Sequence, residues 1–293
     1  MIGLGAAGIW TRQLDEQPAA VAEAAVAELE ALGYGAVWIP EATGREAVSH
    51  AALLLAATRS IGVATGIARV HARSARATAL AQRLLADRFP GRFLLGLGVS
   101  HPHVVEQLLG QVYGPPLATM RSYLDDMDGV TAPARPAPRV LAALGPKMLR
   151  LAAERADGAH TYMAPVAHTR WARDLLGPAP YLAVAIKAAL TSDAAAGSAI
   201  ARWSVRPTIR APAYRANLLR LGFGDGDLAG DVGDRLVDAL VAIGDVDAIV
   251  ERVREHLDAG ANHVCVEVLT GDDTTVPVDA WRALAPGLVA LRM

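Results

Sequence analysis

A regular alternation of short apolar runs and helical patterns constrains the fold of this 293-residue chain more than any other feature. The apolar runs are too uniform for half-solvated strands, so they predict strands that are buried on both faces. We expect eight of them, at residues 2–7, 36–39, 61–67, 93–97, 140–144, 158–162, 181–190 and 263–268. Eight strands that alternate with helices favour an α/β fold, the (β/α)8 TIM barrel. A doubly wound open sheet stays the alternative, because periodicity cannot show whether a sheet closes.

One long segment, residues 193–247, interrupts this alternation. Its pattern is helical, but it contains Pro207, Pro212 and a turn rich in glycine and aspartate at residues 222–234. We expect a helical insertion between strands seven and eight, packed on the barrel within a single domain of residues 1–293. Such an insertion often covers a binding site.

Composition excludes several classes of partner. The formal net charge of −2 leaves no basic surface for nucleic acid, and the apolar run at residues 51–57 is too short to span a bilayer. The single cysteine, Cys265, lies in an apolar run and is expected to be an inert buried thiol. Since one cysteine cannot form an internal disulfide, we expect a cytoplasmic protein. The partner that we expect is a small-molecule substrate.

Active sites of such barrels lie at the carboxyl ends of the strands, and the turn after the fifth strand carries the clearest signal there. In Leu144-Gly-Pro-Lys-Met148, the glycine allows close backbone approach and the proline suits the first position of a helix. The next two amides lack helical partners, which makes a cradle for an anion such as phosphate. An ordinary strand-to-helix turn with a solvated Lys147 is the alternative.

The stretch from Arg88 to His101 predicts a helix end, a buried strand and polar groups at the strand tip. A dinucleotide-binding fingerprint would need a third glycine where His101 stands, so a nicotinamide fold is not expected. Gly96 and Gly98 keep the exit of this strand free of side chains.

His101 and His103 follow this strand and could supply two ligands to a metal ion. Metal-dependent barrel hydrolases carry such a pair after the first strand and an aspartate after the last, and this chain has neither. We expect no metal. The pKa of a histidine lies near neutrality, so His101 is interpreted as a proton-transfer residue, with a hydrogen-bonding loop histidine as the alternative.

Several segments together resemble the luciferase-like monooxygenase superfamily, in its deazaflavin-dependent oxidoreductase branch. The similar segments follow the order of that family: residues 35–41, 66–73, 89–101, 143–148 with 156–158, 214–223 and 259–263. This resemblance implies a (β/α)8 barrel with an insertion between strands seven and eight, a homodimer, and coenzyme F-420 (8-hydroxy-5-deazaflavin) at the strand tips. FMN is the alternative cofactor, because the choice between the two is the less specific part of the resemblance.

The resemblance also implies which residues form the cofactor site. In relatives, a bulge with a cis non-proline peptide supports the ring of the cofactor. The matching peptide bond in this sequence is Gly66-Ile67, or Thr65-Gly66 one bond earlier. The cofactor phosphate would lie on the turn after strand five, and Gly96 and Gly98 would leave room for the ring system beside strand four. The expected cofactor-binding residues are Glu41, Gly66, Ile67, Ala68, Gly98, Ser100, Leu144, Gly145, Pro146, Lys147 and Met148.

One departure affects the expected chemistry. Sugar-phosphate dehydrogenases of this branch carry an acidic residue followed by histidine after strand two and a glutamate after strand four, where this chain has Glu41-Ala42 and His101. Their acid-base roles cannot be transferred, so the role of His101 is our own inference. We expect an F-420-dependent oxidoreductase that exchanges hydride with a small organic substrate. The alternatives are an FMN-dependent monooxygenase and a deazaflavin-binding protein without turnover.

Overall fold

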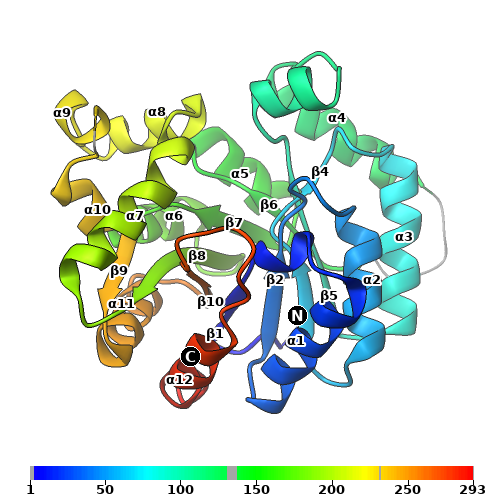
Figure 1. Ribbon diagram of the computed structural model, residues 1–293. Helices are drawn as coiled ribbons and strands as arrows, with labels where there is room; N and C mark the ends of the chain where they lie inside the picture. The colour runs from blue at the N-terminus through cyan, green and yellow to red at the C-terminus, as the bar shows by residue number, and fades with distance from the viewer. Residues whose placement is uncertain (1–2, 131–136, 231, 293) are drawn as a thin grey trace.

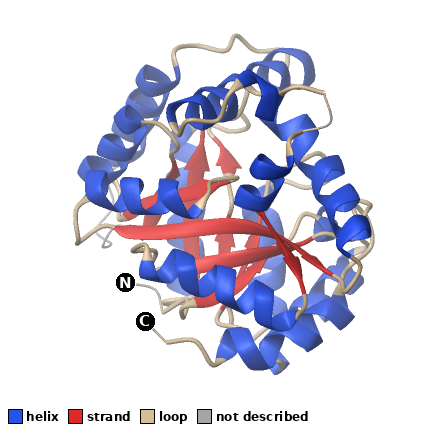
Figure 2. Cartoon of the chain, turned by 90° about the vertical axis from the view of Figure 1, so that its left-hand side faces the viewer, coloured by secondary structure: helices blue, strands red, loops and turns tan. Residues whose placement is uncertain are grey.

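Eight parallel strands form a closed barrel surrounded by helices in the computed structural model, which describes residues 3–130, 137–230 and 232–292 (Figures 1 and 2). The barrel strands are β1 (Ala7–Trp10), β2 (Ala36–Ile39), β3 (Gly62–Thr65), β5 (Phe93–Gly98), β6 (Arg139–Ala142), β7 (Gly158–Tyr162), β8 (Tyr181–Leu190) and β10 (His263–Val268). Strand β10 pairs with both β1 and β8, which closes the sheet. The predicted TIM barrel is therefore confirmed, and the open sheet is excluded.

The first strand differs from its predicted position at residues 2–7. It begins at Ala7, which pairs with Val264, and it runs to Trp10. Gly5 has a φ of +71°, a left-handed conformation that ends any extended run before Ala7. Residue 2 of the predicted strand lies outside the described residues. Trp10 consequently stands at the end of a strand rather than in the loop beyond it.

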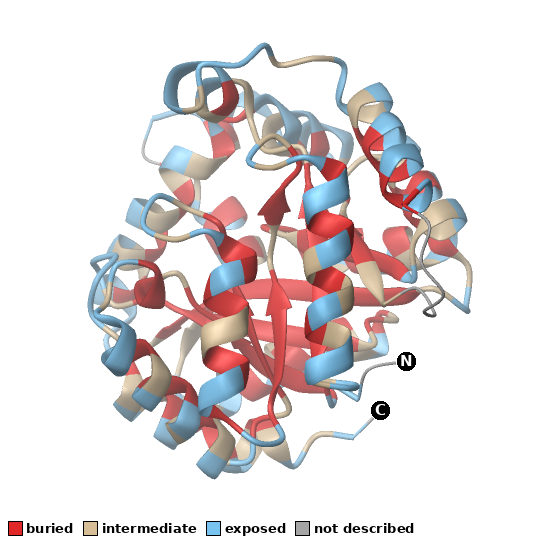
Figure 3. Cartoon of the chain, turned by 90° about the vertical axis from the view of Figure 1, so that its right-hand side faces the viewer, coloured by how far each residue is buried: buried red, intermediate tan, exposed pale blue. Residues whose placement is uncertain are grey.

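Helices cover the outside of the barrel, each with one buried face (Figure 3). They are α1 (Ala19–Ala31), α2 (Ala47–Ala57), α3 (Ala75–Arg88), α4 (Pro116–Asp128), α5 (Pro146–Arg155), α6 (Val166–Leu176), α11 (Val246–Asp258) and α12 (Val278–Val289), with short turns η1 (Gln13–Asp15) and η2 (Val104–Leu108). Side-chain caps fix several starts: Ser74 accepts from the Ala77 amide before α3, and Asp245 accepts from the Ala248 amide before α11. No helix among the described residues is both long and apolar enough to cross a bilayer.

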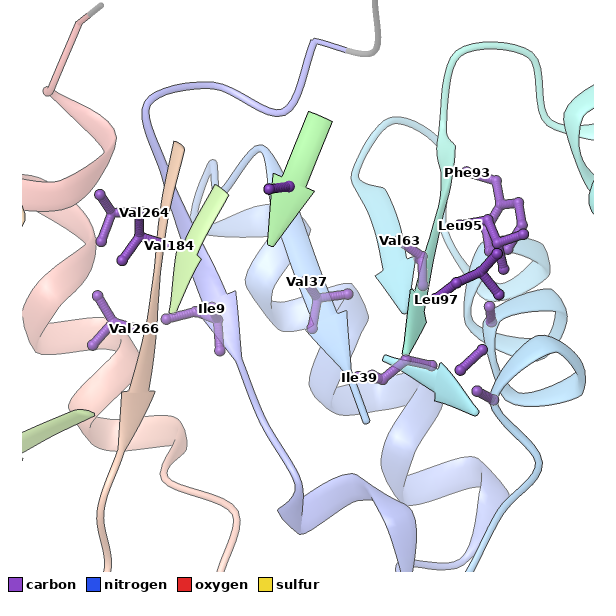
Figure 4. Close-up of a cluster of buried hydrophobic side chains, with 14 of the residues drawn as sticks. Ile9, Val37, Ile39, Val63, Phe93, Leu95, Leu97, Val184, Val264 and Val266 are labelled. Carbon is purple, nitrogen blue, oxygen red and sulfur yellow. The ribbon is translucent and has the colours of Figure 1, made fainter. Parts of the chain in front are cut away.

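Strand side chains alternate between the helix layer and the barrel interior, as the two-residue period of a strand requires. The outer set packs against the helices and includes the strand residues labelled in Figure 4. The inner set includes Trp38, Ala64, Leu94 and Cys265. Cys265 is fully buried, and burial raises the pKa of its thiol well above the usual value, so the prediction of a buried thiol is confirmed.

The insertion after β8 is not purely helical, which corrects one prediction. It contains α7 (Ala194–Ile209), α8 (Pro212–Arg220), α9 (Asp225–Leu228), α10 (Asp234–Leu240) and a further strand, β9 (Val241–Gly244). Strand β9 pairs with the end of β8, because β8 is ten residues long and extends beyond its neighbour β7. Lys187 pairs with both β9 and β10, so these strands take opposite edges of β8. The sequence did not predict β9, because its four residues, Val-Ala-Ile-Gly, lie between two helical patterns.

Candidate functional site

A cavity of about 440 Å³ opens at the carboxyl ends of the barrel strands, within the usual size of small-molecule sites. Nine predicted site residues line it: Glu41, Gly66, Ile67, Gly98, Ser100, His101, Leu144, Gly145 and Met148. The other three do not. Ala68 is fully buried in the core, Pro146 begins α5 behind the turn, and Lys147 is exposed on that helix. The cavity thus brings together most of the residues that the sequence places at different strand ends.

The Gly66–Ile67 peptide bond is cis, as the resemblance implied, and it lies between β3 and the two-residue strand β4 (Ala68–Arg69). Hydrogen bonds hold this bulge on both sides. The Gly66 amide donates to the Ile39 carbonyl at 2.7 Å, and the indole of Trp10 donates to the Gly66 carbonyl at 3.0 Å. The bulge therefore presents a fixed backbone surface to the cavity.

The two glycines of β5 make room for this bulge rather than for a ring system. A Cβ atom on Gly96 would lie 2.0 Å from the Thr65 carbonyl oxygen, and one on Gly98 would lie 2.6 Å from the Ile67 side chain. The space beside the strand is thus already filled by residues 65–67. Gly98 still lines the cavity, but next to Ile67.

Glu41 is buried, and its carboxylate binds groups of the chain itself. It accepts hydrogen bonds from the amide of Arg69 at 2.7 Å and the amide of Ala47 at 3.2 Å, and it forms an ion pair with Arg73. Glu41 thereby joins the residues after the bulge to the start of α2. This geometry assigns it a role in shaping the cavity wall.

The turn after β6, the fifth strand of the barrel, keeps the free amides that the sequence predicts. Gly145 is the N-cap of α5 and supplies no side-chain cap, so the amides of Lys147 and Met148 stay without helical partners. An arginine of α8, absent from the sequence prediction, adds a positive charge here. Nη2 of Arg220 lies 3.9 Å from the position of a Cβ atom on Gly145, and its guanidinium packs over the ring of Trp171. The combination suits an anion.

His101 is half-buried at the cavity wall, on the element that follows β5. Its ring packs 5.5 Å from the ring of Tyr214 and 5.9 Å from that of His103. Burial, and then the charge of His103, lowers the pKa of His101 below its ordinary value. Ser100 precedes it with a φ of 59°, and its carbonyl accepts a hydrogen bond from Tyr113 at 3.2 Å. His101 is therefore a neutral, positioned imidazole near pH 7.

An aromatic wall faces this histidine. The rings of Trp10 and Tyr162 stack with centroids 5.2 Å apart, and Tyr214 meets Tyr162 edge-on at 6.2 Å. The Tyr162 hydroxyl donates to Glu267, which also accepts from Lys187, each at 2.8 Å. Burial, followed by the charge of Glu267, raises the pKa of Tyr162 well above its usual value.

Three further aromatic side chains form the floor of the cavity and the layer beneath it. His160 of β7 lines the cavity and stacks on Trp38 with ring centroids 4.4 Å apart. The Trp38 indole donates to Nε2 of His263 at 3.0 Å. Nδ1 of His263 in turn donates to the Gly5 carbonyl at 2.9 Å, which fixes the tautomer of that ring.

The family profile described as luciferase-like monooxygenase matches residues 5–263 of the sequence. The chain belongs to the luciferase-like monooxygenase family. A Mycobacterium tuberculosis protein named as a putative coenzyme F-420-dependent oxidoreductase is 33% identical over 162 residues. That match covers 55% of this chain and 44% of the relative, so it spans less than half the length of the relative.

Solved structures of the same fold hold both deazaflavin and flavin. An F-420-dependent secondary alcohol dehydrogenase, in complex with an F-420-acetone adduct, has a TM-score of 0.76 and 15% identity over 97% of this chain and 99% of its own. The F-420-dependent tetrahydromethanopterin reductase of Methanopyrus kandleri has a TM-score of 0.72 and 16% identity over 97% and 98%. The oxygenating constituent of 3,6-diketocamphane monooxygenase from Pseudomonas putida, in complex with FMN, has a TM-score of 0.72 and 14% identity over 99% of each chain.

The predicted set of site residues omits several that line or support this luciferase-like site. Trp10 and Tyr162 stand at strand ends, and their position marks them as candidates in the sequence although no role was assigned to them. Arg220 lies in the insertion, and Lys187 and Glu267 lie within strands, where no local pattern marks them. His101 and His103 belong to no group of three or more metal-ligating side chains among the described residues.

Proposed function

We propose that this luciferase-like protein is an F-420-dependent oxidoreductase, in which His101 transfers a proton while the deazaflavin exchanges hydride with a small organic substrate. One observation carries the proposal. A single cavity joins the cis bulge at Gly66–Ile67, the free amides at the start of α5, and the neutral imidazole of His101. The F-420-dependent relative and the F-420-bound structure of the same fold support this choice of cofactor.

The residues present fit such a cofactor. The amides of Lys147 and Met148, together with Arg220, would bind its phosphate. Leu144, Gly145 and Pro146 shape that turn, and Nε2 of His168 fixes it through a hydrogen bond of 3.0 Å to the Leu144 carbonyl. The remaining predicted residues would bound the ring, either directly or by building the bulge: Glu41, Gly66, Ile67, Ala68, Gly98 and Ser100.

The bound deazaflavin would supply two-electron hydride chemistry, while the protein supplies position and proton transfer. A neutral imidazole can accept a proton, because one ring nitrogen carries a free lone pair. His101 therefore suits the removal of a hydroxyl proton from a substrate that is losing hydride. In the opposite direction, the protonated form of the same residue would return that proton.

The cavity favours a neutral substrate. Its deep charged side chains already have partners: the Glu41 carboxylate binds backbone amides and Arg73, and the Arg69 guanidinium donates to backbone carbonyls. The aromatic wall of Trp10 and Tyr162 adds apolar surface. A small organic molecule without a charge is therefore the expected substrate, and a sugar phosphate is not.

Titration of the purified protein with F-420 and with FMN tests the assignment. We expect quenching of F-420 fluorescence with saturable binding, and weaker binding of FMN. Tight binding of FMN without binding of F-420 would assign the protein as a flavin-dependent monooxygenase instead. If His101→Ala binds F-420 and changes no measured turnover, the protein is a deazaflavin-binding protein without the proposed catalysis.

We also propose a cytoplasmic homodimer, which rests on the family resemblance and on the single buried cysteine. Light scattering coupled to gel filtration would give twice the chain mass of 30.6 kDa. A single-chain mass would overturn the dimer without affecting the assignment of the cofactor.

A further inference from the structure

Tyr214 is a cavity residue whose polar atom has no partner in the fold. It is the third residue of α8, is half-buried, and lines the cavity. Its hydroxyl oxygen forms no hydrogen bond within residues 3–130, 137–230 and 232–292, and it is not completely buried either. The hydroxyl is therefore a hydrogen-bonding group that a molecule in the cavity can reach.

The aromatic wall holds this side chain on the inner side of α8. The ring of Tyr214 meets that of Tyr162 edge-on, with 72° between the ring planes. Burial, and then the charge of Glu267, raises the pKa of Tyr214, so its hydroxyl stays protonated at neutral pH. Glu267 lies behind the wall, where it accepts the hydrogen bond of Tyr162. The Tyr214 hydroxyl is thus directed inward, close enough for that charge to act on it.

The imidazole of His101 offers the complementary capacity beside it. The rings of His101 and Tyr214 lie 5.5 Å apart, tilted by 44°. In the part of the chain that the structure describes, neither ring nitrogen of His101 has a hydrogen-bond partner, and neither is completely buried. A protonated hydroxyl that donates and a neutral imidazole that accepts therefore stand on neighbouring rings at one side of the cavity.

We propose that the Tyr214 hydroxyl donates a hydrogen bond to the same substrate oxygen whose proton His101 accepts. The oxygen of an uncharged alcohol fits both groups, because it carries lone pairs for the tyrosine and a proton for the histidine. The substrate class is then an alcohol, or the ketone or aldehyde formed from it, with an apolar body against Trp10 and Tyr162. This inference rests on the proposed function and adds a substrate-binding residue from the insertion.

The hydrogen bond from Tyr214 also has a chemical role. During oxidation the carbon–hydrogen bond of the alcohol breaks, its electron pair leaves with the hydrogen as hydride to the deazaflavin, and the hydroxyl proton passes to His101. A carbonyl group forms, and Tyr214 keeps its own proton. Negative charge develops on the oxygen as the proton leaves, or as hydride adds to the carbonyl in the reverse direction. A donor fixed beside that oxygen stabilises this charge.

Tyr214→Phe tests the inference through binding, with cyclohexanone as the probe. The ketone and the oxidised cofactor cannot react with each other, so the protein loaded with F-420 forms a stable complex with the probe, followed by F-420 fluorescence. The Kd of cyclohexanone should rise roughly 3- to 10-fold, because one hydrogen bond is lost. The Kd of F-420 should stay unchanged. Oxidation of cyclohexanol should slow roughly 100-fold in kcat.

Tyr34→Phe provides a matched control. The Tyr34 hydroxyl is buried and donates to the Trp281 carbonyl at 2.8 Å, and this residue does not line the cavity. Its loss should lower the unfolding temperature and leave the Kd of cyclohexanone unchanged. Tyr214→Phe should do the opposite, since its hydroxyl has no partner in the fold. A marked loss of stability in Tyr214→Phe would assign the hydroxyl to the fold and overturn the inference.

The outcomes separate this inference from the proposed function. Wild-type protein that fails to bind F-420 would overturn both. Protein that binds F-420 but neither binds cyclohexanone nor oxidises cyclohexanol would overturn the inference alone. Tyr214→Phe with the wild-type Kd for cyclohexanone would do the same. A loss of F-420 affinity in this variant would place the hydroxyl on the cofactor, and would also overturn its assignment to the substrate.

Discussion

The hydroxyl of Tyr162 donates a hydrogen bond of 2.8 Å to the carboxylate of Glu267, just behind the aromatic wall of the cavity. Lys187 binds the same carboxylate oxygen at 2.8 Å, and its ammonium also lies 5.1 Å from the centre of the Tyr162 ring. Because the paired carboxylate can only accept, the tyrosine proton stays directed toward it. Tyr162 is thus held as a neutral wall residue, and His101 is left as the titrating group beside it.

Removal of Lys187 tests this arrangement. Both side chains of the pair are at most 4% exposed, so Lys187→Met would leave an unpaired charge in the interior. We expect the free energy of unfolding to fall by about 3–5 kcal/mol, measured by denaturant titration. The exposed pair of Arg254 and Glu251 is the control, and Arg254→Met should change stability little. Equal effects of the two substitutions would contradict the buried-pair interpretation.

The proposed acid-base role of His101 predicts a specific pH dependence. The protonated ring cannot accept a proton, so the rate of substrate oxidation should fall as the pH drops through the pKa of His101. This midpoint should lie below the ordinary value of 6.5. His101→Ala should reduce the rate roughly 100- to 10,000-fold and abolish this limb of the profile.

His103 is the control for that profile. Its charge is the second cause of the lowered pKa of His101, so His103→Ala should move the midpoint upward while turnover persists. Rates are measured from pH 4.5 to 8 with saturating cofactor. A midpoint that His103→Ala does not move would contradict the electrostatic coupling between the two rings.

The turn at residues 144–148, which is proposed to bind the cofactor phosphate, predicts a contrast between two cations. Arg220 lines the cavity beside Gly145, whereas Lys147 is exposed and points away from it. Arg220→Met should weaken F-420 binding roughly 10- to 100-fold, the value of a charge-assisted hydrogen bond. Lys147→Met should have a much smaller effect. Comparable losses in the two variants would show that the lysine reaches the phosphate after all.

Gly96 should tolerate no side chain. A Cβ atom there would lie 2.0 Å from a backbone carbonyl oxygen of residue 65, which a side-chain rotation cannot relieve. Gly96→Ala should therefore destabilise the fold by about 3 kcal/mol, or prevent folding. Gly226→Ala is the control, since no atom of the described residues lies within 4 Å of its Cβ position. Thermal unfolding of the two variants checks the contrast.

Buried histidines predict sensitivity to acid. Burial lowers the pKa values of His50 and His263 to about 4, against 6.5 when unfolded. Below pH 6.5 the unfolded chain therefore binds more protons than the folded chain. The free energy of unfolding then decreases as the pH is lowered, by up to about 1.4 kcal/mol per pH unit for each histidine. Unfolding titrations between pH 7 and pH 5 should show this slope, and His50→Leu should reduce it. An unchanged slope would exclude His50 as a contributor.

Sequence patterns were sufficient wherever one local physical rule dominated. The runs at Tyr181–Leu190 and His263–Val268 form strands at the predicted bounds, because runs in which most residues are apolar are favoured to be buried on both faces. The first strand was misplaced because the turn at Gly5 depends on a backbone angle that its neighbours do not specify. Strand β9 was missed because it forms only where the end of β8 extends beyond β7.

The candidate site shows the same division. Residues that directly follow a strand, such as His101 and Gly145, could be found from order along the chain, because parallel strands place their carboxyl ends together. The partnership of Lys187 with Glu267 could not, since it depends on the register of β8 against β10. Arg220 approaches Gly145 across 75 positions of sequence, and no periodic pattern records such a contact.

Helix α8 forms one side of the cavity and lies in the insertion, outside the barrel itself. Its nine residues contribute Ala213, Tyr214, Ala216 and Arg220 to the lining, while the rest of the lining comes from strand ends, the loops that follow them and the first turns of α4 and α5. Helix α8 takes no part in the pairing of the barrel strands. An exchange of these nine residues alone would change which molecules enter while the sheet keeps its register. Such a segment would allow selection to change the ligands that the cavity accepts without altering the barrel.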